Sequence, residues 1–145
     1  MGIPNRTLSD YQQAWEKLVD KGFSNYESMT PAERIWFNLQ TLLDTVDNGG
    51  LISHYYNTDA DRNRETIEDL IVFGFPELAD LLLSINAWFP GGHPSLDIEE
   101  RNDAISNWAE GQYDSLLEEF DNRFYAMETA LESALVNHIE QKGLN

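Results

Sequence analysis

Residues 30–50 read TPAERIWFNLQTLLDTVDNGG and contain the signals for both ends of one helix. Thr30 has the side chain of an N-cap, Pro31 suits the first helical position, and Glu33 completes a capping box. Between the two ends, apolar residues recur at helical spacing. The helix is predicted to stop at residues that accept the left-handed conformation needed to satisfy its last carbonyls, namely Asn48, Gly49 and Gly50.

Helical patterns continue on both sides of this segment. Ser9 and Gln12 have capping-box spacing and predict an earlier helix over about 9–21, followed by a linker over 22–29. Asp97 is the predicted cap of a later helix that carries Trp108. The remaining predicted helices cover 51–56, about 62–73, 76 to a break at 90, and about 113–141. We therefore predict a single compact all-α domain over residues 1–145, with six or seven helices and a long acidic C-terminal helix.

The composition is strongly acidic, with 26 Asp and Glu residues against 9 Lys and Arg residues and a formal charge of −17. Fourteen of the acids lie between Glu65 and Asp121, where Arg101 is the single base. Such a field repels phosphate, so direct binding to nucleic acid or to an anionic membrane is not expected. The expected partner is a basic protein.

Other functional classes lose support from residues that the chain lacks. There is no Cys, which removes disulfides, thiolate metal sites and a Cys nucleophile from consideration. No apolar run approaches the roughly 20 residues of a membrane span, and the N-terminus is not built like a signal peptide. We therefore expect a cytoplasmic protein without a cofactor.

The C-terminal helix combines an apolar stripe with an acidic row. The stripe, expected to face the core, contains Tyr113, Leu116, Phe120, Phe124, Met127, Leu131, Leu135 and His138. About 110° around the helix lie Asp114, Glu118, Asp121, Glu128 and Glu132. The preceding helix is predicted to repeat this device with Glu99, Asp103 and Glu110.

The spacing of the acidic row resembles that of phosphates along a DNA strand. The row spans about 27 Å of helix axis, so its five carboxylates average roughly 6.7 Å apart. Neighbouring phosphates on one strand of B-DNA lie roughly 6.5 Å apart. A protein that holds DNA phosphates is therefore expected to accept this row in place of a strand, although a solvated acidic face has the same pattern.

Several motifs resemble those of a small bacterial family typified by an acidic DNA-mimic protein. They are the Thr-Pro-Ala-Glu helix start at 30–33, Asn-Gly-Gly at 48–50, aromatics with Asn at 55–57, and Arg-Phe-Tyr-Ala-Met-Glu at 123–128. The resemblance covers about residues 28–140 and includes Tyr55 and Asn57. It implies an all-helical fold and binding to DNA-binding proteins in place of DNA. The acidic rows are not part of it and rest on spacing and charge alone.

A metal site is a weaker alternative. One segment has the ligand spacing of a calcium-binding EF-hand loop, with Asn57, Asp59, Asp61, Asn63, Glu65 and Glu68. Arg62 stands where that loop needs Gly, and Arg64 adds a second positive charge, so we expect Asp59 or Asp61 to cap the next helix instead. The three histidines do not have the spacing of a zinc site, and we predict no metal.

Two further functions remain open. A small enzyme would use the Asn-Gly-Gly region with His54, Asn57 and a carboxylate such as Asp47, but no nucleophile motif or phosphate loop accompanies them. An immunity-type inhibitor of a basic nuclease toxin would share the electrostatics of a DNA mimic. The best-supported hypothesis is a non-enzymatic DNA mimic that occupies the DNA-binding surface of a transcription regulator or nucleoid protein. A homodimer of the mimic would extend its acidic surface.

Overall fold

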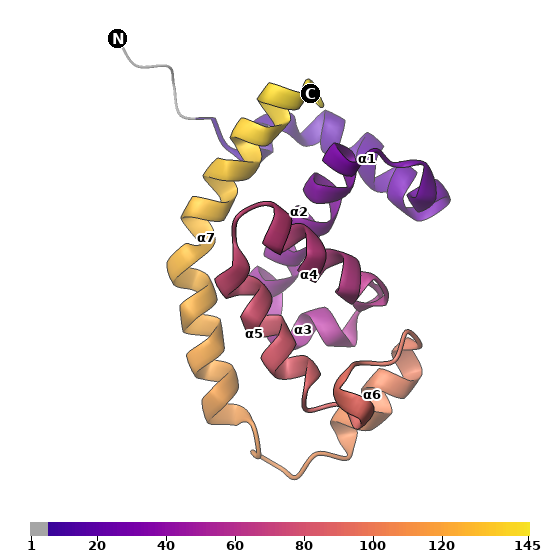
Figure 1. Ribbon diagram of the computed structural model, residues 1–145, viewed down its shortest axis with the longest axis vertical. Helices are drawn as coiled ribbons and strands as arrows, with labels where there is room; N and C mark the ends of the chain where they lie inside the picture. The colour runs from indigo at the N-terminus through magenta and orange to yellow at the C-terminus, as the bar shows by residue number, and fades with distance from the viewer. Residues whose placement is uncertain (1–5) are drawn as a thin grey trace.

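Figure 1 shows the computed structural model, which describes residues 6–145 as an assembly of helices. The prediction of an all-α fold is confirmed, and no strand occurs among these residues. The seven α-helices are α1 Gln12–Asn25, α2 Pro31–Gly49, α3 Leu51–Tyr56, α4 Asn63–Val72, α5 Pro76–Asn86, α6 Ile98–Ser106 and α7 Asp114–Lys142. Four short 3-10 helices join them, namely η1 Leu8–Tyr11, η2 Tyr26–Ser28, η3 Thr58–Arg62 and η4 Pro90–Gly92.

Helix α2 is the centre of the fold. Its start is as predicted, because Thr30 Oγ1 accepts from the Glu33 amide at 3.1 Å and the Glu33 carboxylate accepts from the Thr30 amide at 2.9 Å. The apolar face is wholly buried at Leu39, Leu42 and Val46. It contacts α1, α3, α4 and α7, so one helix organises most of the core.

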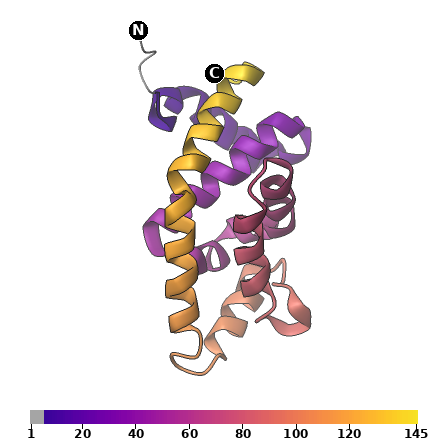
Figure 2. The same cartoon turned by 60° about the vertical axis from the view of Figure 1, so that its left-hand side comes forward.

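Helix α7 extends along one side of the molecule over its full height (Figures 1 and 2). The C-terminus lies at the same end as the beginning of the described chain. Helix α6 and the first turns of α7 lie at the opposite end, joined by an extended loop. Within residues 6–145, no helix is both long and apolar enough to cross a bilayer.

The Asn-Gly-Gly box forms the junction of α2 and α3. Asn48 and Gly49 are still helical, and Gly50 alone has a positive φ, with φ 80° and ψ 179°. The Gly50 amide donates to the Val46 carbonyl at 2.7 Å, which closes α2. The chain then enters α3 at once, with its predicted boundaries.

The N-terminal region differs from the prediction. Thr7, rather than Ser9, forms the capping box, with Asp10, and it caps η1 rather than an α-helix. Helix α1 continues through Gly22, so the predicted linker is largely helical. A Cβ at Gly22 would overlap the Phe37 ring, which shows that glycine serves close packing here and does not end the helix.

The predicted stripe of α7 is correct only in its central and C-terminal parts. Phe120, Phe124, Leu131, Leu135 and His138 are buried, together with Val136 and Ile139, which the stripe did not include. Leu116 is exposed, because the first turns of α7 extend beyond the main core. There Tyr113 instead stacks on Trp88, with ring centroids 4.0 Å apart.

Candidate interaction surface

Acidic and basic residues are segregated along the molecule. In the described part of the chain, none of the eleven Asp and Glu residues from Glu77 to Asp121 lies within 4.0 Å of a basic side-chain nitrogen. Many of these acids are exposed on α6, on the loop after it and on the first turns of α7. This end of the molecule therefore presents carboxylates that no internal ion pair neutralises.

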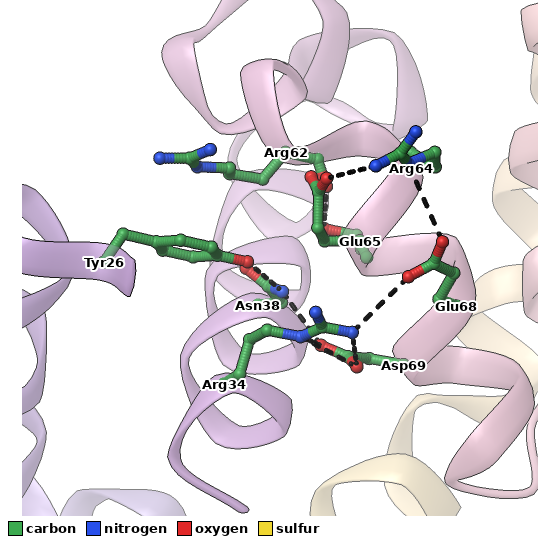
Figure 3. Close-up of polar contacts among 9 residues, drawn as sticks. Tyr26, Arg34, Asn38, Arg62, Arg64, Glu65, Glu68 and Asp69 are labelled. Atoms are coloured by element: carbon green, nitrogen blue, oxygen red, sulfur yellow. Dashed lines mark hydrogen bonds and ion pairs between the residues drawn. The ribbon is translucent and has the colours of Figure 1, made fainter. Parts of the chain in front are cut away.

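Bases on α1, α2, η3 and α4 form ion pairs, and their partners are acids outside residues 77–121. Figure 3 shows the largest group, in which Arg34 binds Asp69 at 2.7 Å from Nη2 and 3.1 Å from Nε. Asn38 Nδ2 donates to Asp69 at 2.9 Å and to the Tyr26 hydroxyl at 2.9 Å. Arg34 also approaches Glu68 at 3.6 Å. These contacts join α2 to α4, and all three acids of α4, Glu65, Glu68 and Asp69, have a basic partner.

Arg101, the single base of the acidic segment, is completely buried. Its guanidinium donates to the carbonyls of Tyr55, Asn57 and Ser95 at 3.1, 2.8 and 2.8 Å and pairs with Asp61 at 2.9 Å. Its charge therefore satisfies the C-terminal end of α3 and does not reach the outer surface. Burial of this base makes the surface more acidic than the sequence alone indicates.

The predicted row on α7 divides into two halves. Asp114 and Glu118 are exposed, whereas Asp121, Glu128 and Glu132 are half-buried against the rest of the fold. Asp121 Oδ1 accepts from the Leu51 amide at 2.8 Å and so caps α3. Only the first half of the row is a freely solvated line of carboxylates.

The second half of the row forms an acidic cluster with α2. Asp44, Asp47, Glu128 and Glu132 line a common cavity of about 300 Å³. A hydrogen bond with Asp47, together with burial, raises the pKa of Glu128 from 4.5 to about 7. Burial, followed by repulsion from Asp47, raises the pKa of Asp44. Near neutral pH this cluster therefore carries less than its formal charge.

The α2 members of this cluster were missed as partner-binding candidates. Asp44 and Asp47 are spaced three residues apart on the exposed face of α2, so their common orientation was visible in the sequence. Their approach to α7 was not, because it depends on how two distant helices pack.

The acidic row predicted on the helix before α7 is partly wrong. Glu99 and Asp103 are exposed on α6, but α6 ends at Ser106 and Glu110 lies in the following loop. Gly111 has φ 73°, and the Gln112 amide donates to the Ala109 carbonyl at 3.0 Å, so a turn replaces the expected last helical turn. Helix α6, the loop after it and the first turns of α7 nevertheless lie at the same end of the molecule (Figure 1).

The histidine considered for catalysis lies in a buried polar network. His54 is 1% exposed, and its Nδ1 faces Asp59 at 3.4 Å rather than Asp47. Asn63 Nδ2 donates to His54 Nε2 at 3.1 Å, which assigns the proton to Nδ1. Both ring nitrogens have protein partners, as expected of a histidine that joins α3 to η3 and α4.

Tyr55, an aromatic residue of the resemblance motif at 55–57, extends this hydrogen-bond network. Tyr55 OH donates to Asn86 Oδ1 at 2.6 Å and also lies 3.0 Å from the Leu82 carbonyl oxygen. Asn86 Nδ2 in turn donates to Asn63 Oδ1 at 2.8 Å. Asn57 Nδ2 closes the end of α3 by donating to the Ser53 carbonyl at 2.6 Å. The resemblance motif therefore contributes to packing around α3.

The segment with calcium-ligand spacing folds as helix and not as a loop. It is divided between η3 and α4, and its acids face different partners, since Asp59 contacts His54 and Asp61 pairs with Arg101. Neither caps α4, which corrects that prediction, because Arg62 is the N-cap residue. Across residues 6–145, no group of three or more His, Asp or Glu side chains is arranged to hold a metal ion.

Together these features define a small all-α protein in which, among residues 6–145, ion pairs involve only acids outside residues 77–121, and the acids of α6 and the start of α7 have none. The chain belongs to the DMP19-like protein family, because the model of that family matches residues 27–142. No curated protein and no solved structure is significantly similar to the chain.

Proposed function

We propose that this protein acts by binding and not by catalysis, as a DNA mimic that occupies the DNA-binding surface of a basic protein. The observation that supports the proposal is the set of exposed, unpaired carboxylates on α6 and the start of α7. Unpaired like charges reduce the stability of a helix slightly, so the stability of the fold does not explain them. Attraction to a cationic partner explains these exposed carboxylates instead.

The proposed contact surface begins with the exposed acids and continues toward α2. Its exposed members are Glu99, Asp103, Glu110, Asp114 and Glu118. Asp121, Glu128 and Glu132 form its half-buried continuation, next to Asp44 and Asp47. The resemblance of the helix-start and Asn-Gly-Gly motifs to a DNA-mimic family supports the same class of partner, a transcription regulator or nucleoid protein.

Affinity capture from a lysate of the source organism tests this proposal. The protein is immobilised, and bound proteins are identified by mass spectrometry after washing at low and at high salt. Because the attraction is between exposed charges, we expect DNA-binding proteins at low salt and their loss at high salt. Recovery of a nuclease toxin would favour the immunity-type alternative, and a set without basic proteins would contradict the proposal.

A further inference from the structure

A cleft of about 400 Å³ lies between α1, α2 and η3, and none of the predicted acidic rows contributes to it. One wall is aromatic and consists of Trp15, Phe23, Tyr26 and Phe37. Phe23 is 77% exposed at the rim and meets the Phe37 ring edge-on, with centroids 6.4 Å apart. The size and the apolar wall are those of a site for a small organic molecule.

The facing wall is acidic and polar. Asp59 Oδ2 accepts from Thr45 Oγ1 at 3.0 Å and faces His54 Nδ1. Among residues 6–145, the other Asp59 oxygen, Oδ1, has no hydrogen-bond partner. Asn63 occupies His54 Nε2, and His54 Nδ1 contacts only Oδ2 of Asp59, so Asp59 Oδ1 is left for a further partner. Asp44 adds a second carboxyl group to the lining.

An arginine already lies on the aromatic wall. The Arg62 guanidinium stands over the Tyr26 ring, 4.0 Å from its centroid, and Figure 3 shows the two side chains facing each other. Arg62 also approaches Glu27 at 3.9 Å. Cations bind aromatic faces through the ring quadrupole, so this contact indicates the kind of group that the cleft accepts.

From this geometry we infer that the cleft binds a small organic cation, an amine, amidine or guanidine attached to a flat apolar body. The apolar body packs against the aromatic wall that Phe23 and Phe37 form, and the cationic group faces Asp59. A neutral molecule of the same shape would cover Asp59 without adding a counter-charge, and an anion would face Asp44, Asp59 and Asp61, which outnumber Arg62 in the lining. The inference does not depend on the proposed function, because no residue of the acidic rows lines the cleft, and Asp44 alone belongs to both the cleft and the α2–α7 cluster.

Three isosteric probes test the inference. Benzamidine, benzamide and benzoate have the same ring and differ in charge, and binding is followed by amide chemical shifts in two-dimensional NMR. The titrations are made at roughly 150 mM salt, which screens the nonspecific attraction of a cationic probe to a protein of charge −17. We expect benzamidine to shift residues that line the cleft and to bind at least about tenfold more tightly than benzamide. Equal affinities for benzamidine and benzamide would overturn the inference.

Two variants locate the site. Asp59→Asn keeps an acceptor for Thr45 and removes the charge, and Phe23→Ala removes an exposed part of the wall without disturbing the core. Each is expected to weaken benzamidine binding severalfold, while Glu118→Gln on α7, which removes the same charge elsewhere, leaves it unchanged. If Asp59→Asn does not fold, Phe23→Ala still decides. Unchanged affinity in Phe23→Ala, or equal loss in Glu118→Gln, would contradict a site in this cleft.

Discussion

Gly50 has a backbone conformation that only glycine adopts readily. Its φ of 80° and ψ of 179° lie in a region that costs other residues of order 1–3 kcal/mol. A Cβ there would also meet Asp121 Oδ2 at 2.6 Å, which would disturb the cap of α3. A single residue thus determines how α2 turns into α3.

Replacing Gly50 by Val is expected to lower the free energy of unfolding by about 1–3 kcal/mol, measured by urea denaturation. Gly49→Ala is the matched control, because Gly49 has no positive φ and helical Ala is favoured over Gly by about 0.5–1 kcal/mol, although the Ser53 hydroxyl must rotate away from the new Cβ. Equal stability of Gly50→Val and the parent would mean that the junction is misassigned.

Arg101 illustrates the cost of a buried charge whose partners depend on it. Arg101→Met is expected to reduce the free energy of unfolding by about 3–5 kcal/mol, because Asp61 loses its ion-pair partner and three carbonyls lose their hydrogen-bond donor. Arg123→Met makes the same change at an exposed site on α7 and should remain within about 0.5 kcal/mol of the parent. Similar thermal denaturation curves for the two variants would contradict an internal role for Arg101.

At the scale of helices, local signals predicted most boundaries. The capped start of α2, the Pro that begins α5 and the Asp97 cap of α6 all act within one helical turn, so the sequence contains them completely. Gly22 was misread because its role depends on the Phe37 ring from another helix. Glu110 was misread because a short turn with Gly111 competes with one more turn of α6.

The acidic cluster between α2 and α7 predicts a pH-dependent stability. Glu128 has a folded-state pKa of about 7, above its ordinary value of 4.5, because Asp47 hydrogen-bonds its protonated form. The folded state therefore holds this proton more tightly than the unfolded chain. The resulting stabilisation is complete below about pH 4.5 and is lost as the pH rises through 7.

Glu128→Gln should remove this part of the pH dependence. Between pH 5 and pH 8, the parent is expected to lose up to about 1 kcal/mol more unfolding free energy than the variant, since solvent screens this partly exposed group. Glu118→Gln, an exposed carboxylate on the same helix, controls for the general effect of one charge. Parallel pH profiles for the parent and Glu128→Gln would show that no shared proton contributes.

At the scale of the whole molecule, the sequence predicted the sign of the surface but not its arrangement. Charge and helical spacing identified the exposed Asp114 and Glu118. They could not show that Asp121 caps α3 or that Glu128 faces Asp47, because the face of α7 that meets α2 and α3 is decided by packing. Nor could they show that Arg101 is buried, which is a property of three segments meeting around one side chain.

We propose that the exposed carboxylates at the α6–α7 end replace DNA phosphates. Competition with duplex DNA for the captured partner tests this role. Asp114→Asn with Glu118→Gln is compared with Glu16→Gln and Asp20→Asn, a pair of exposed acids with the same spacing on α1. The measured quantities are the association rate and its dependence on salt.

We expect the α7 double variant to associate about tenfold more slowly, with a shallower salt dependence, and to displace DNA less well. The α1 double variant should behave like the parent. Equal competition by the two double variants would contradict the claim and would place the recognition surface elsewhere.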